Sequence, residues 1–363
     1  MTAQMKLCII SPSLKMGGIA RVLTELANEW VKSELNITFI SCLQGNRHYQ
    51  LDNKIHFIEP EFKRSSSFFN KLIFYPRLIV FIYKNVKKEK PHAVLSFGDV
   101  FNPIVLLSLW FVRIPVFISD RTSPDYKHST FIKLLKKFTY SRSDGMLCQT
   151  KHAQKYKLKE YGNQLNTFVI DNPVRKINIK EGARENFILY VGRFAWEKGP
   201  DRLIHAFSQL KRQCDWRLIM AGDGPLLAEM KLLAKKLEVE DKIEFPGKVK
   251  DVDALYSKAS VFVLPSRVEG FPNALCEAMI AGLPVICFDG FPADEIIHHN
   301  YDGIILKDGD IDMLSKTIQT LIDKPEERIR LGKNASIIFE RLNVRNISTQ
   351  LIRYIESETL RNK

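Results

Sequence analysis

Short apolar runs of strand length alternate with longer helix-like segments along the whole chain. Most runs are followed by a segment whose pattern suits a helix, as in a series of strand-helix units. The first seven runs are "LCIISPSL", "NITFISCL", "IHFIEP", "HAVLSF", "VFISD", "GMLCQT" and "TFVIDNPV". Such a series folds as a parallel sheet with helices on both faces. The alternation therefore predicts the α/β class, with a doubly wound, Rossmann-like sheet.

The alternation is interrupted once and then starts again. The polar stretch 175–186 fits neither pattern, and a second series begins at "FILYVGRF", residues 187–194. In this second series we expect helices at 200–213, 225–238, 251–259, 293–299 and 311–323. A chain of 363 residues with 45% hydrophobic content is long enough for two cores. Two Rossmann-like domains joined by a linker at 175–186 are therefore predicted.

The predicted N-terminal domain spans 1–174 and the C-terminal domain spans 187–340. The last segment, 341–363, is expected to be helical, and the sequence leaves open whether it returns to the N-terminal domain. Ligands of open parallel sheets sit at the carboxyl ends of the strands. Two such sheets facing each other would form a cleft, so functional residues are expected in the loops that follow strands.

The stretch "LPSRVEGFPNALCEAMIAGLPVICFDG" contains two carboxylates eight positions apart. Glu269 lies in the loop after an apolar strand, and Glu277 lies in the first turns of the next helix. Pro272 is placed where that helix would begin, since its missing N–H would have no partner there. Unpaired backbone N–H groups at this helix start would favour an anion such as a phosphate. We expect such N–H groups at Phe271, Asn273 and Ala274.

Two further loops after strands carry unusual residues. The loop "GRFAWEKG" places Arg193 and Lys198 close together, where they could hold a diphosphate or be solvated surface cations. The loop "KMGGIAR" contains Gly17 and Gly18, which allow close approach of a ligand to the backbone just before a helix. It is not Gly-x-Gly-x-x-Gly, so the sequence gives little support for dinucleotide binding.

The sequence offers no convincing metal site. The two Asp-x-Asp matches, Asp251/Asp253 and Asp310/Asp312, fall at predicted helix starts, where Asp commonly caps the helix. The six cysteines are scattered without a Cys-x-x-Cys motif, which favours buried thiols in a reducing compartment over zinc or disulfides. No signal peptide is evident, and the longest apolar run, 103–112, is too short to span a membrane. We therefore expect a cytoplasmic protein that needs no metal.

The positive charge is confined to the first half of the chain. Residues 1–180 hold 28 Lys and Arg against 13 Asp and Glu, whereas 181–363 hold 26 against 28. The imbalance indicates an anionic partner for the first half. The aromatic and basic stretch 67–90 could lie at an anionic membrane surface, or be a core helix with a solvated basic face. Nucleic acid is not expected as a partner, because no known base-reading module is visible.

Several motifs occur in an order that resembles glycosyltransferase family 4, the retaining nucleotide-sugar enzymes of GT-B fold. The motifs are "GGIAR", "DNPV", "VGRFAWEKG", "AGDGP", "FPGKVKDVDALYSKASVFVLPSRVEGFPNALCEAM" and "GLPVI". The resemblance covers nearly the whole chain and is most specific across 187–310. It implies that the C-terminal domain binds a nucleotide-sugar donor, that the N-terminal domain binds the acceptor, and that catalysis takes place between them.

The resemblance also implies roles for the two carboxylates and the helix start. By this resemblance Glu277 bonds the ribose hydroxyls and Glu269 contacts the donor sugar. The helix start "FPNA", comprising Phe271, Pro272, Asn273 and Ala274, faces the sugar and the distal phosphate.

The same resemblance assigns the diphosphate to Arg193 and Lys198. Gly17 and Gly18 match a glycine loop that closes over the phosphates from the other domain. Cations and helix-start amides stabilise the charge that develops on a departing diphosphate. A metal ion or other cofactor is then not required.

The chain departs from the family pattern after the strand "VFISD". Many family members have a His near the reacting carbon at this point, whereas this chain reads "SDRTSP". Asp120 is therefore a candidate contact for the acceptor hydroxyl, or it forms a structural salt bridge with Arg121. The sequence does not decide between these two interpretations.

We expect a retaining glycosyltransferase that moves a hexose or N-acetylhexosamine, with UDP as the first expectation for the nucleotide. The expected acceptor is a saccharide or lipid-linked saccharide used in surface glycan assembly. Two alternatives stay open: a nucleotide-sugar epimerase of similar fold, and a non-catalytic nucleotide-binding or nucleic-acid-binding protein. A peripheral location at the inner face of the cell membrane is also left open by the basic first half.

Overall fold

The structure is a computed structural model that describes residues 5–15, 17–64, 68–121, 129–180, 182–211 and 215–361, with side chains in the segment 68–89 described from residue 73 onward. The chain forms two compact units, which are described separately. Unit 1 comprises residues 1–173 and 342–363, and unit 2 comprises residues 174–341.

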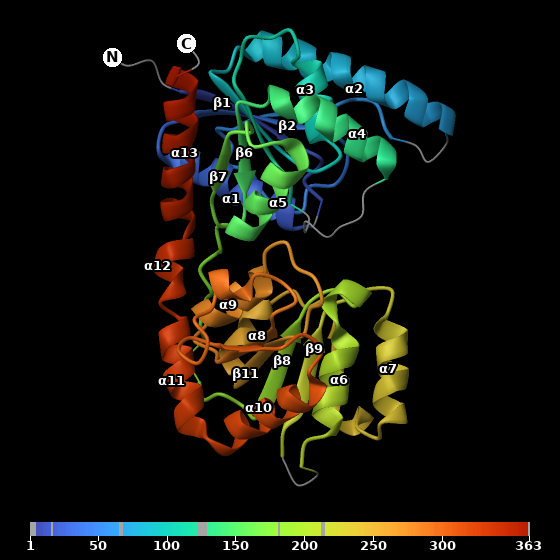
Figure 1. Ribbon diagram of the computed structural model, residues 1–363, viewed down its shortest axis with the longest axis vertical. Coiled ribbons are helices and arrows are strands. Elements are labelled where there is room, and N and C mark those ends of the chain that lie inside the picture. The colour runs from blue at the N-terminus through green and yellow to red at the C-terminus, as the bar shows by residue number, and fades with distance from the viewer. Residues whose placement is uncertain are drawn as a thin grey trace. The chain divides into compact units, whose positions relative to one another are not determined.

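Unit 1 is built on a seven-stranded parallel sheet (Figure 1). Its strands lie in the order β3-β2-β1-β4-β5-β6-β7. They are β1 (Lys6–Ser11), β2 (Asn36–Ser41), β3 (His56–Ile58), β4 (Ala93–Phe97), β5 (Val116–Ser119), β6 (Gly145–Cys148) and β7 (Thr167–Val169). The helices are α1 (Gly18–Lys32), α2 (Phe68–Glu89), α3 (Asn102–Ser108), α4 (Thr130–Thr139), α5 (Lys151–Tyr161) and α13 (Val344–Arg361).

Alternate side chains of the central strand β1 enter two different cores of unit 1. Leu7 and Ile9 pack on one face with residues of α1 and α13, whereas Cys8 and Ile10 pack on the other face with residues of α2 and α3. A strand that is apolar on both sides must be covered on both sides. The predicted doubly wound arrangement is therefore confirmed for this unit.

Unit 2 contains a six-stranded parallel sheet in the order β10-β9-β8-β11-β12-β13. The strands are β8 (Phe187–Val191), β9 (Arg217–Ala221), β10 (Ile243–Gly247), β11 (Val261–Leu264), β12 (Val285–Phe288) and β13 (Ile304–Leu306). The helices are α6 (Pro200–Ser208), α7 (Leu227–Lys236), α8 (Val252–Lys258), α9 (Asn273–Ile280), α10 (Ile311–Asp323), α11 (Pro325–Ala335) and α12 (Ile338–Leu342). The α/β class predicted for this half is confirmed as well.

The helix predicted at 293–299 is wrong. The structure has only a short 3-10 turn at Ala293–Glu295. The backbone N–H of His298 donates to the Asp302 carboxylate at 2.7 Å, and His299 forms a bridge with Gly303. A nearby carboxylate thus takes the N–H group that a continuing helix would use.

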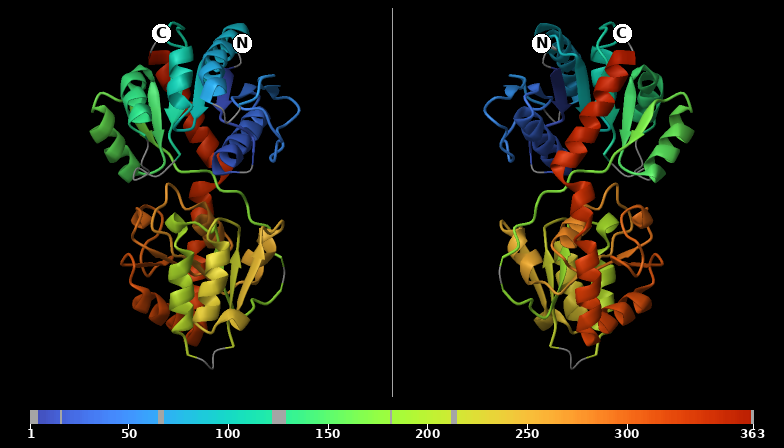
Figure 2. Two further views of the ribbon diagram at one scale, coloured as in Figure 1. Left: turned by 90° about the vertical axis from the view of Figure 1, so that its right-hand side faces the viewer. Right: turned by 90° about the vertical axis from the view of Figure 1, so that its left-hand side faces the viewer.

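The C-terminal helix α13 belongs to unit 1, where it packs along α1 (Figure 2). The indole N–H of Trp30 donates to the carbonyl of Ser348 at 3.1 Å. Tyr354 stacks on Phe168 with ring centroids 4.3 Å apart. These contacts make α13 part of unit 1.

The segment predicted as a linker, 175–186, has no helix or strand among its described residues. It is nevertheless tied to unit 2. The guanidinium of Arg184 donates to the carbonyls of Tyr256, Ala259, Ala281 and Gly282. The described residues of the segment therefore belong to unit 2.

Candidate functional site

Two loops at the carboxyl ends of the neighbouring strands β8 and β11 are joined by backbone contacts in unit 2. The carbonyl of Glu197 accepts hydrogen bonds from the N–H groups of Arg267 at 2.9 Å and Val268 at 3.1 Å. Gly199 has φ of 59°, and a Cβ there would lie 2.3 Å from the carbonyl oxygen of Pro265. Only glycine combines this conformation with so close an approach. The two loops therefore form one site, the β8–β11 loop pair (192–199 and 265–271).

Lys198 and Glu269 form an ion pair in the middle of this loop pair. The Nζ atom of Lys198 lies 2.7 Å from both carboxylate oxygens of Glu269. The hydroxyl of Ser266 donates to Oε1 of the same carboxylate at 2.8 Å. Glu269 is 7% exposed, whereas the Lys198 side chain is 28% exposed. The ammonium group is therefore held in a defined position and still reaches solvent, as a group that meets a ligand must.

Arg193 lies at the rim of the same loop. Its guanidinium pairs with Glu197 at 2.5 Å, and its side chain is 63% exposed. Exposed ion pairs contribute little to stability, because water screens both charges. Arg193 can therefore exchange Glu197 for an anionic ligand at small cost.

The "AGDGP" turn packs against the backbone of the β8–β11 loop pair. A Cβ on Gly222 would lie 1.9 Å from the carbonyl oxygen of Gly192, and one on Gly224 would lie 2.4 Å from that of Phe194. The N–H of Phe194 donates to the carbonyl of Asp223 at 3.0 Å. A side chain at either glycine would collide with this backbone, so the turn has a structural role.

Glu277 is buried beside residues that the sequence interpretation missed. Its Oε2 accepts a hydrogen bond from the hydroxyl of Tyr256 at 3.1 Å, and its Oε1 lies 3.9 Å from Nε of Arg175. Arg175 also pairs with Asp253. Burial lowers the pKa of Arg175, but the hydrogen bond to Asp253 and the charge of Glu277 outweigh burial and raise it. The position of Arg175 directly after the "DNPV" motif was the one available signal for it.

The start of α9 differs in part from the prediction. Pro272 directly precedes the helix, which begins at Asn273. The N–H of Asn273 was expected to be unpaired. It donates instead to the carbonyl of Phe271 at 3.0 Å in a tight turn. Proline before the helix fixes this turn, and the turn takes the amide away from a ligand. Phe271 is buried, while Ala274 in the first helical turn is partly exposed and stays a candidate.

Gly17 and Gly18 lie at the start of α1 in unit 1, and both are exposed. Gly17 has an extended backbone, and the nearest atom to a Cβ built on it is the carbonyl oxygen of Lys15 at 4.0 Å. The protein itself therefore does not require glycine at position 17. Space for the close approach of a ligand is present, and the phosphate-binding role of this loop stays a prediction.

Asp120 lies in a buried polar cluster of unit 1, and its side chain is 1% exposed. Its carboxylate accepts hydrogen bonds from four donors: Lys136 at 3.1 Å, Lys157 at 2.6 Å, Tyr140 at 2.5 Å and Asn102 at 3.1 Å. A carboxylate has about four acceptor sites. All four are used here, so in this structure the carboxylate is not placed to contact an acceptor hydroxyl.

The structure gives Arg121 other partners than Asp120, although their pairing was the alternative interpretation. The Arg121 guanidinium lies 3.8 Å from the centroid of the Phe97 ring and bonds the Asn172 side chain. Burial raises the pKa of the Asp120 carboxyl, but the ammonium groups of Lys157 and Lys136 outweigh burial and hold that pKa well below its usual range. Asp120 is therefore a buried, charged residue directly after β5 that pairs with Lys136 and Lys157.

The first aspartate of each Asp-x-Asp pair caps a helix, as predicted. Asp251 accepts from the N–H of Ala254, and Asp310 accepts from the N–H of Met313. Asp253 and Asp312 bond Arg175 and Gln209. Within the described ranges, no group of three or more His, Cys, Asp or Glu side chains is arranged to hold a metal ion.

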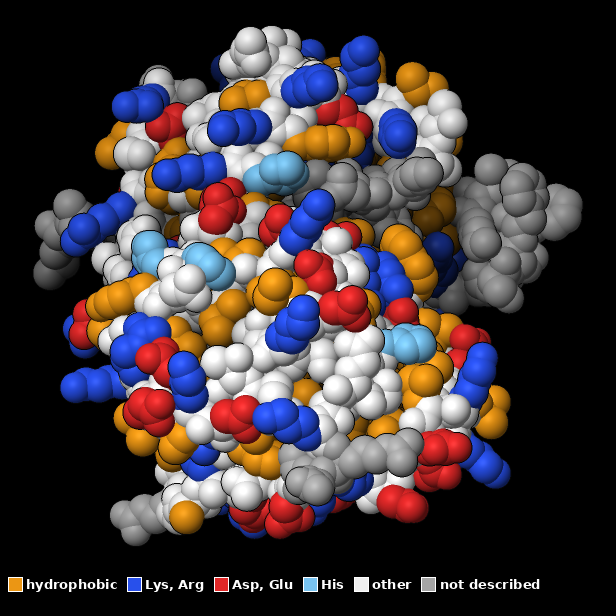
Figure 3. All heavy atoms as spheres, turned by 60° about the horizontal axis from the view of Figure 1, so that its bottom comes forward, with side chains coloured by type: hydrophobic (Ala, Val, Ile, Leu, Met, Phe, Trp, Pro, Cys, Tyr) orange, Lys and Arg blue, Asp and Glu red, His pale blue; other side chains and the backbone are white. Residues whose placement is uncertain are grey.

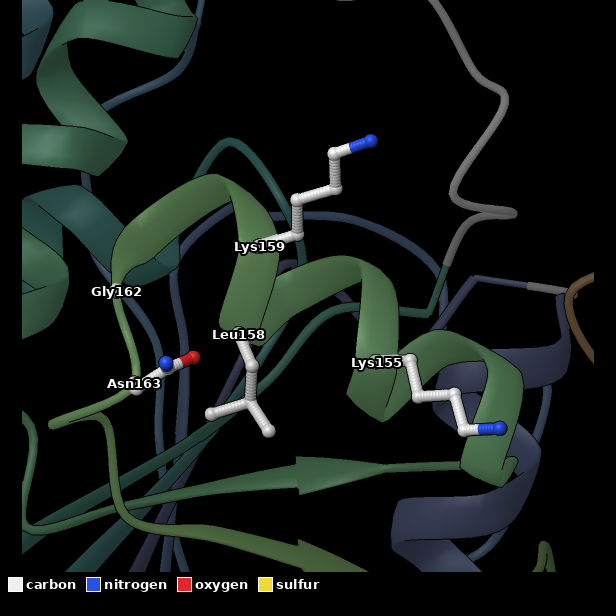
Figure 4. A pocket seen from close by; sticks show the side chains of 5 residues that line it. All are labelled: Lys155, Leu158, Lys159, Gly162 and Asn163. Carbon is white, nitrogen blue, oxygen red and sulfur yellow. The ribbon is translucent and has the colours of Figure 1, made fainter.

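The wider surface adds little to this site. On the face seen in Figure 3, basic and acidic side chains are interspersed. A cavity of about 580 Å³ lies on α5 of unit 1 (Figure 4) and contains none of the predicted site residues. Its lining residues are Lys155, Leu158, Lys159, Gly162 and Asn163.

No described helix has both the length and the apolar character needed to cross a membrane.

Two families of known proteins match this chain, one in each half. Residues 16–175 match the family described as Glycosyltransferase Family 4, and residues 173–337 match Glycosyl transferases group 1. A protein of Campylobacter jejuni, "GalNAc-alpha-(1->4)-GalNAc-alpha-(1->3)-diNAcBac-PP-undecaprenol alpha-1,4-N-acetyl-D-galactosaminyltransferase", is 26% identical over 359 residues, 97% of this chain and 98% of that protein. The amylovoran biosynthesis glycosyltransferase AmsD of Erwinia amylovora is 27% identical over 78% of this chain and 80% of its own.

The fold is shared with a solved structure. Anabaena Alr3699/HepE, crystallised in complex with UDP, aligns over 97% of this chain and 100% of its own with a TM-score of 0.83 and 19% identity. The GT-B fold class predicted from the sequence is thereby confirmed.

Proposed function

Because the chain belongs to the glycosyltransferases whose two domains match Glycosyltransferase Family 4 and Glycosyl transferases group 1, we propose that it transfers a hexose or N-acetylhexosamine from a UDP-sugar with retention of configuration. The observation that carries this proposal is the Lys198–Glu269 ion pair at the ends of two neighbouring strands of unit 2. In this pair the Lys198 ammonium can meet the diphosphate, and the Glu269 carboxylate can accept a hydrogen bond from a sugar hydroxyl.

The donor is assigned to unit 2. Lys198 and Arg193 neutralise the diphosphate, and the first turn of α9 adds the N–H of Ala274. Glu277, oriented by Tyr256 at 3.1 Å, accepts hydrogen bonds from the ribose hydroxyls. Glu269 accepts from a hydroxyl of the sugar. UDP is the proposed nucleotide because HepE, which shares the fold, was crystallised with UDP.

The chemistry consists of charge stabilisation at the leaving group. As the bond between sugar and phosphate breaks, negative charge grows on the diphosphate, and the preorganised Lys198 ammonium stabilises this charge more in the transition state than in the ground state. A base or nucleophile from the protein is not assigned. Both oxygens of Glu269 are bonded to Lys198, which suits the holding of a hydroxyl better than attack on carbon. The departing phosphate takes the acceptor proton.

The acceptor is assigned to unit 1 and is proposed to be a saccharide or lipid-linked saccharide of surface glycan assembly. The Campylobacter relative is named for transfer to a sugar linked through a diphosphate to undecaprenol, and the Erwinia relative for amylovoran biosynthesis. A lipid-linked acceptor would explain the basic first half of the chain and a peripheral location at the membrane. An epimerase would instead convert the donor without any acceptor, so a strict requirement for acceptor distinguishes the two activities.

The proposed donor site is tested by nucleotide binding. UDP-sugars, GDP-sugars and ADP-sugars are screened for their effect on thermal unfolding, since a ligand that binds only the native state stabilises it. We expect UDP-sugars to give the largest increase in the unfolding temperature.

Glu277→Ala should weaken UDP binding by about 2–3 kcal/mol in calorimetry, because hydrogen bonds to a charged acceptor are lost. Glu326→Ala, an exposed position on α11, is the control. Unchanged affinity in the Glu277 variant would remove this residue from the ribose site.

Metal independence is a second expected outcome. The positive field of Arg193, Lys198 and the α9 start should sustain transfer without a divalent ion, so the rate of turnover should persist in excess EDTA. Activity that disappears with EDTA and returns with magnesium or manganese would contradict this proposal.

A further inference from the structure

Helix α4 in unit 1 has its apolar face outside and a charged residue inside. Lys136 is 0% exposed, whereas Phe131, Leu134 and Phe138 are 71%, 63% and 62% exposed. At about 100° per residue, these three side chains form one stripe on the face opposite Lys136. A surface helix of a globular protein normally has the opposite orientation.

The buried cluster explains why α4 keeps this orientation. Lys136 Nζ lies 2.8 Å from Asp99 and 3.1 Å from Asp120, both of which are buried. Turning the helix to bury its apolar stripe would pull the ammonium away from these carboxylates and leave buried charges without compensation. The ion pairs therefore fix an exposed apolar stripe.

Residues next to α3 extend the stripe into a larger surface. The ring of Trp110 stacks on Phe138 with centroids 5.2 Å apart and planes 11° apart. Phe111 follows and is 94% exposed. We name Trp110, Phe111, Phe131, Leu134 and Phe138 the α4 patch. Five large apolar side chains grouped in this way mark an interaction surface.

The charges around the α4 patch are positive. Lys133, Lys137, Arg113 and Arg142 are exposed, and the Arg142 guanidinium lies 4.4 Å from the centroid of the Trp110 ring. Among the described residues between 102 and 144, the acidic side chains are the buried Asp120 and the partly buried Asp144, which accepts a hydrogen bond from the N–H of Val116 at 2.7 Å. A partner for this surface must therefore accept apolar side chains and also carry negative charge.

Helix α3 packs against both α2 and α4, so these helices lie on the same side of unit 1 (Figure 1). The outer face of α2 exposes Ile73 and Val80, with Arg77, Lys84 and Lys87 alongside. The two helices thus present the same combination of apolar and basic side chains. This breadth suits an extended surface better than a single binding pocket.

We propose that the α4 patch inserts into the headgroup region of an anionic lipid bilayer. Phe111, Phe131 and Phe138 enter the boundary between headgroups and acyl chains, while Lys133 and Lys137 extend to the lipid phosphates. This inference goes beyond the proposed transfer reaction, because binding to lipid requires neither donor nor acceptor. Loss of lipid binding and loss of donor binding can therefore be measured independently.

The test is sedimentation of the full chain with vesicles of phosphatidylcholine alone or mixed with phosphatidylglycerol. We expect strong binding to the mixed vesicles only. Phe131→Ser/Phe138→Ser should lower the partition coefficient roughly 100-fold, at about tenfold for each large apolar side chain withdrawn. The control is Leu232→Ser/Ile329→Ser in unit 2, where the side chains are 68% and 71% exposed. All four positions are on the surface, so folding should be unaffected.

A second variant tests the charge, and fluorescence tests the location. Lys133→Glu/Lys137→Glu should weaken binding to the mixed vesicles, and Trp110 emission should shift to the blue on binding in a Trp196→Phe background. Equal binding to both kinds of vesicle, no binding, or an unchanged partition coefficient in the phenylalanine variant would overturn the proposal. Self-association that depends on Phe131 and Phe138, without vesicle binding, would assign the surface to a second copy instead.

Discussion

Replacing Lys198 by Ala is expected to lower kcat/KM for sugar transfer by a factor of about 10²–10³, the usual effect of removing one preorganised group that stabilises developing negative charge. The ammonium is held 2.7 Å from both oxygens of Glu269 by a loop whose backbone is bonded to its neighbour. Water cannot replace a charge fixed in that position. The measurement is steady-state transfer with a UDP-sugar and a lipid-linked acceptor.

Lys258→Ala is the matched control for the Lys198 variant. Lys258 also pairs with a glutamate of unit 2, at 3.0 Å, but its side chain is 61% exposed. We expect unchanged kcat/KM in this control. Retention of more than about a third of wild-type kcat/KM in Lys198→Ala would contradict the assigned role, because it corresponds to less than about 1 kcal/mol of transition-state stabilisation.

Asp120→Asn is expected to lower the free energy of unfolding by about 3–5 kcal/mol, as measured by urea denaturation. The substitution keeps the size of the side chain but leaves two buried ammonium groups, Lys136 and Lys157, with Asp99 as their remaining buried carboxylate. Removing one partner from a buried ion pair has an effect of this size. A change below 1 kcal/mol would show that the cluster does not anchor unit 1.

The same variant has a distinct pH dependence. Because Lys157 and Lys136 hold the pKa of Asp120 below its usual range despite burial, the charged form stabilises the wild type above about pH 4 and this stability is lost as the pH falls further. The difference between wild type and Asp120→Asn should therefore shrink in acid. Asp251→Asn, which breaks an exposed pair with Lys180, is the control and should change stability by less than about 1 kcal/mol.

The fold was predictable because strand and helix patterns alternate with little ambiguity. A buried parallel strand has to be apolar on both faces, and runs such as "KLCIIS" and "VFVL" satisfy this requirement. The helix predicted at 293–299 does not form, because the Asp302 carboxylate accepts the hydrogen bond of the His298 backbone N–H. Such competition depends on geometry that the pattern of apolar residues does not contain.

The site was predictable in part. Glu269 and Lys198 could be selected because both follow strands, yet their direct pairing depends on β8 and β11 being neighbours in the sheet. Arg175 and Tyr256 were missed because one lies in a segment without regular structure and the other in the middle of α8. Their roles appear only when Glu277 is placed between them.

Asp120 shows where interpretation of the sequence failed. Its nearest charged neighbour in the chain is Arg121, but its ammonium partners are Lys136 and Lys157, 16 and 37 positions away. The same pairing sets the rotation of α4 and exposes its apolar stripe. Hydrophobic periodicity alone would have turned that helix the other way.

We predict transfer from a nucleotide sugar with retention, and proton NMR of the first product tests this most directly. With an α-linked UDP-sugar of gluco or galacto configuration and a lipid-linked acceptor, the new anomeric proton should show the small axial-equatorial coupling of an α-linkage. That result would mean that the acceptor attacked from the face that the diphosphate left. A large diaxial coupling would show inversion, which requires a base on the opposite face, and would contradict the proposed mechanism.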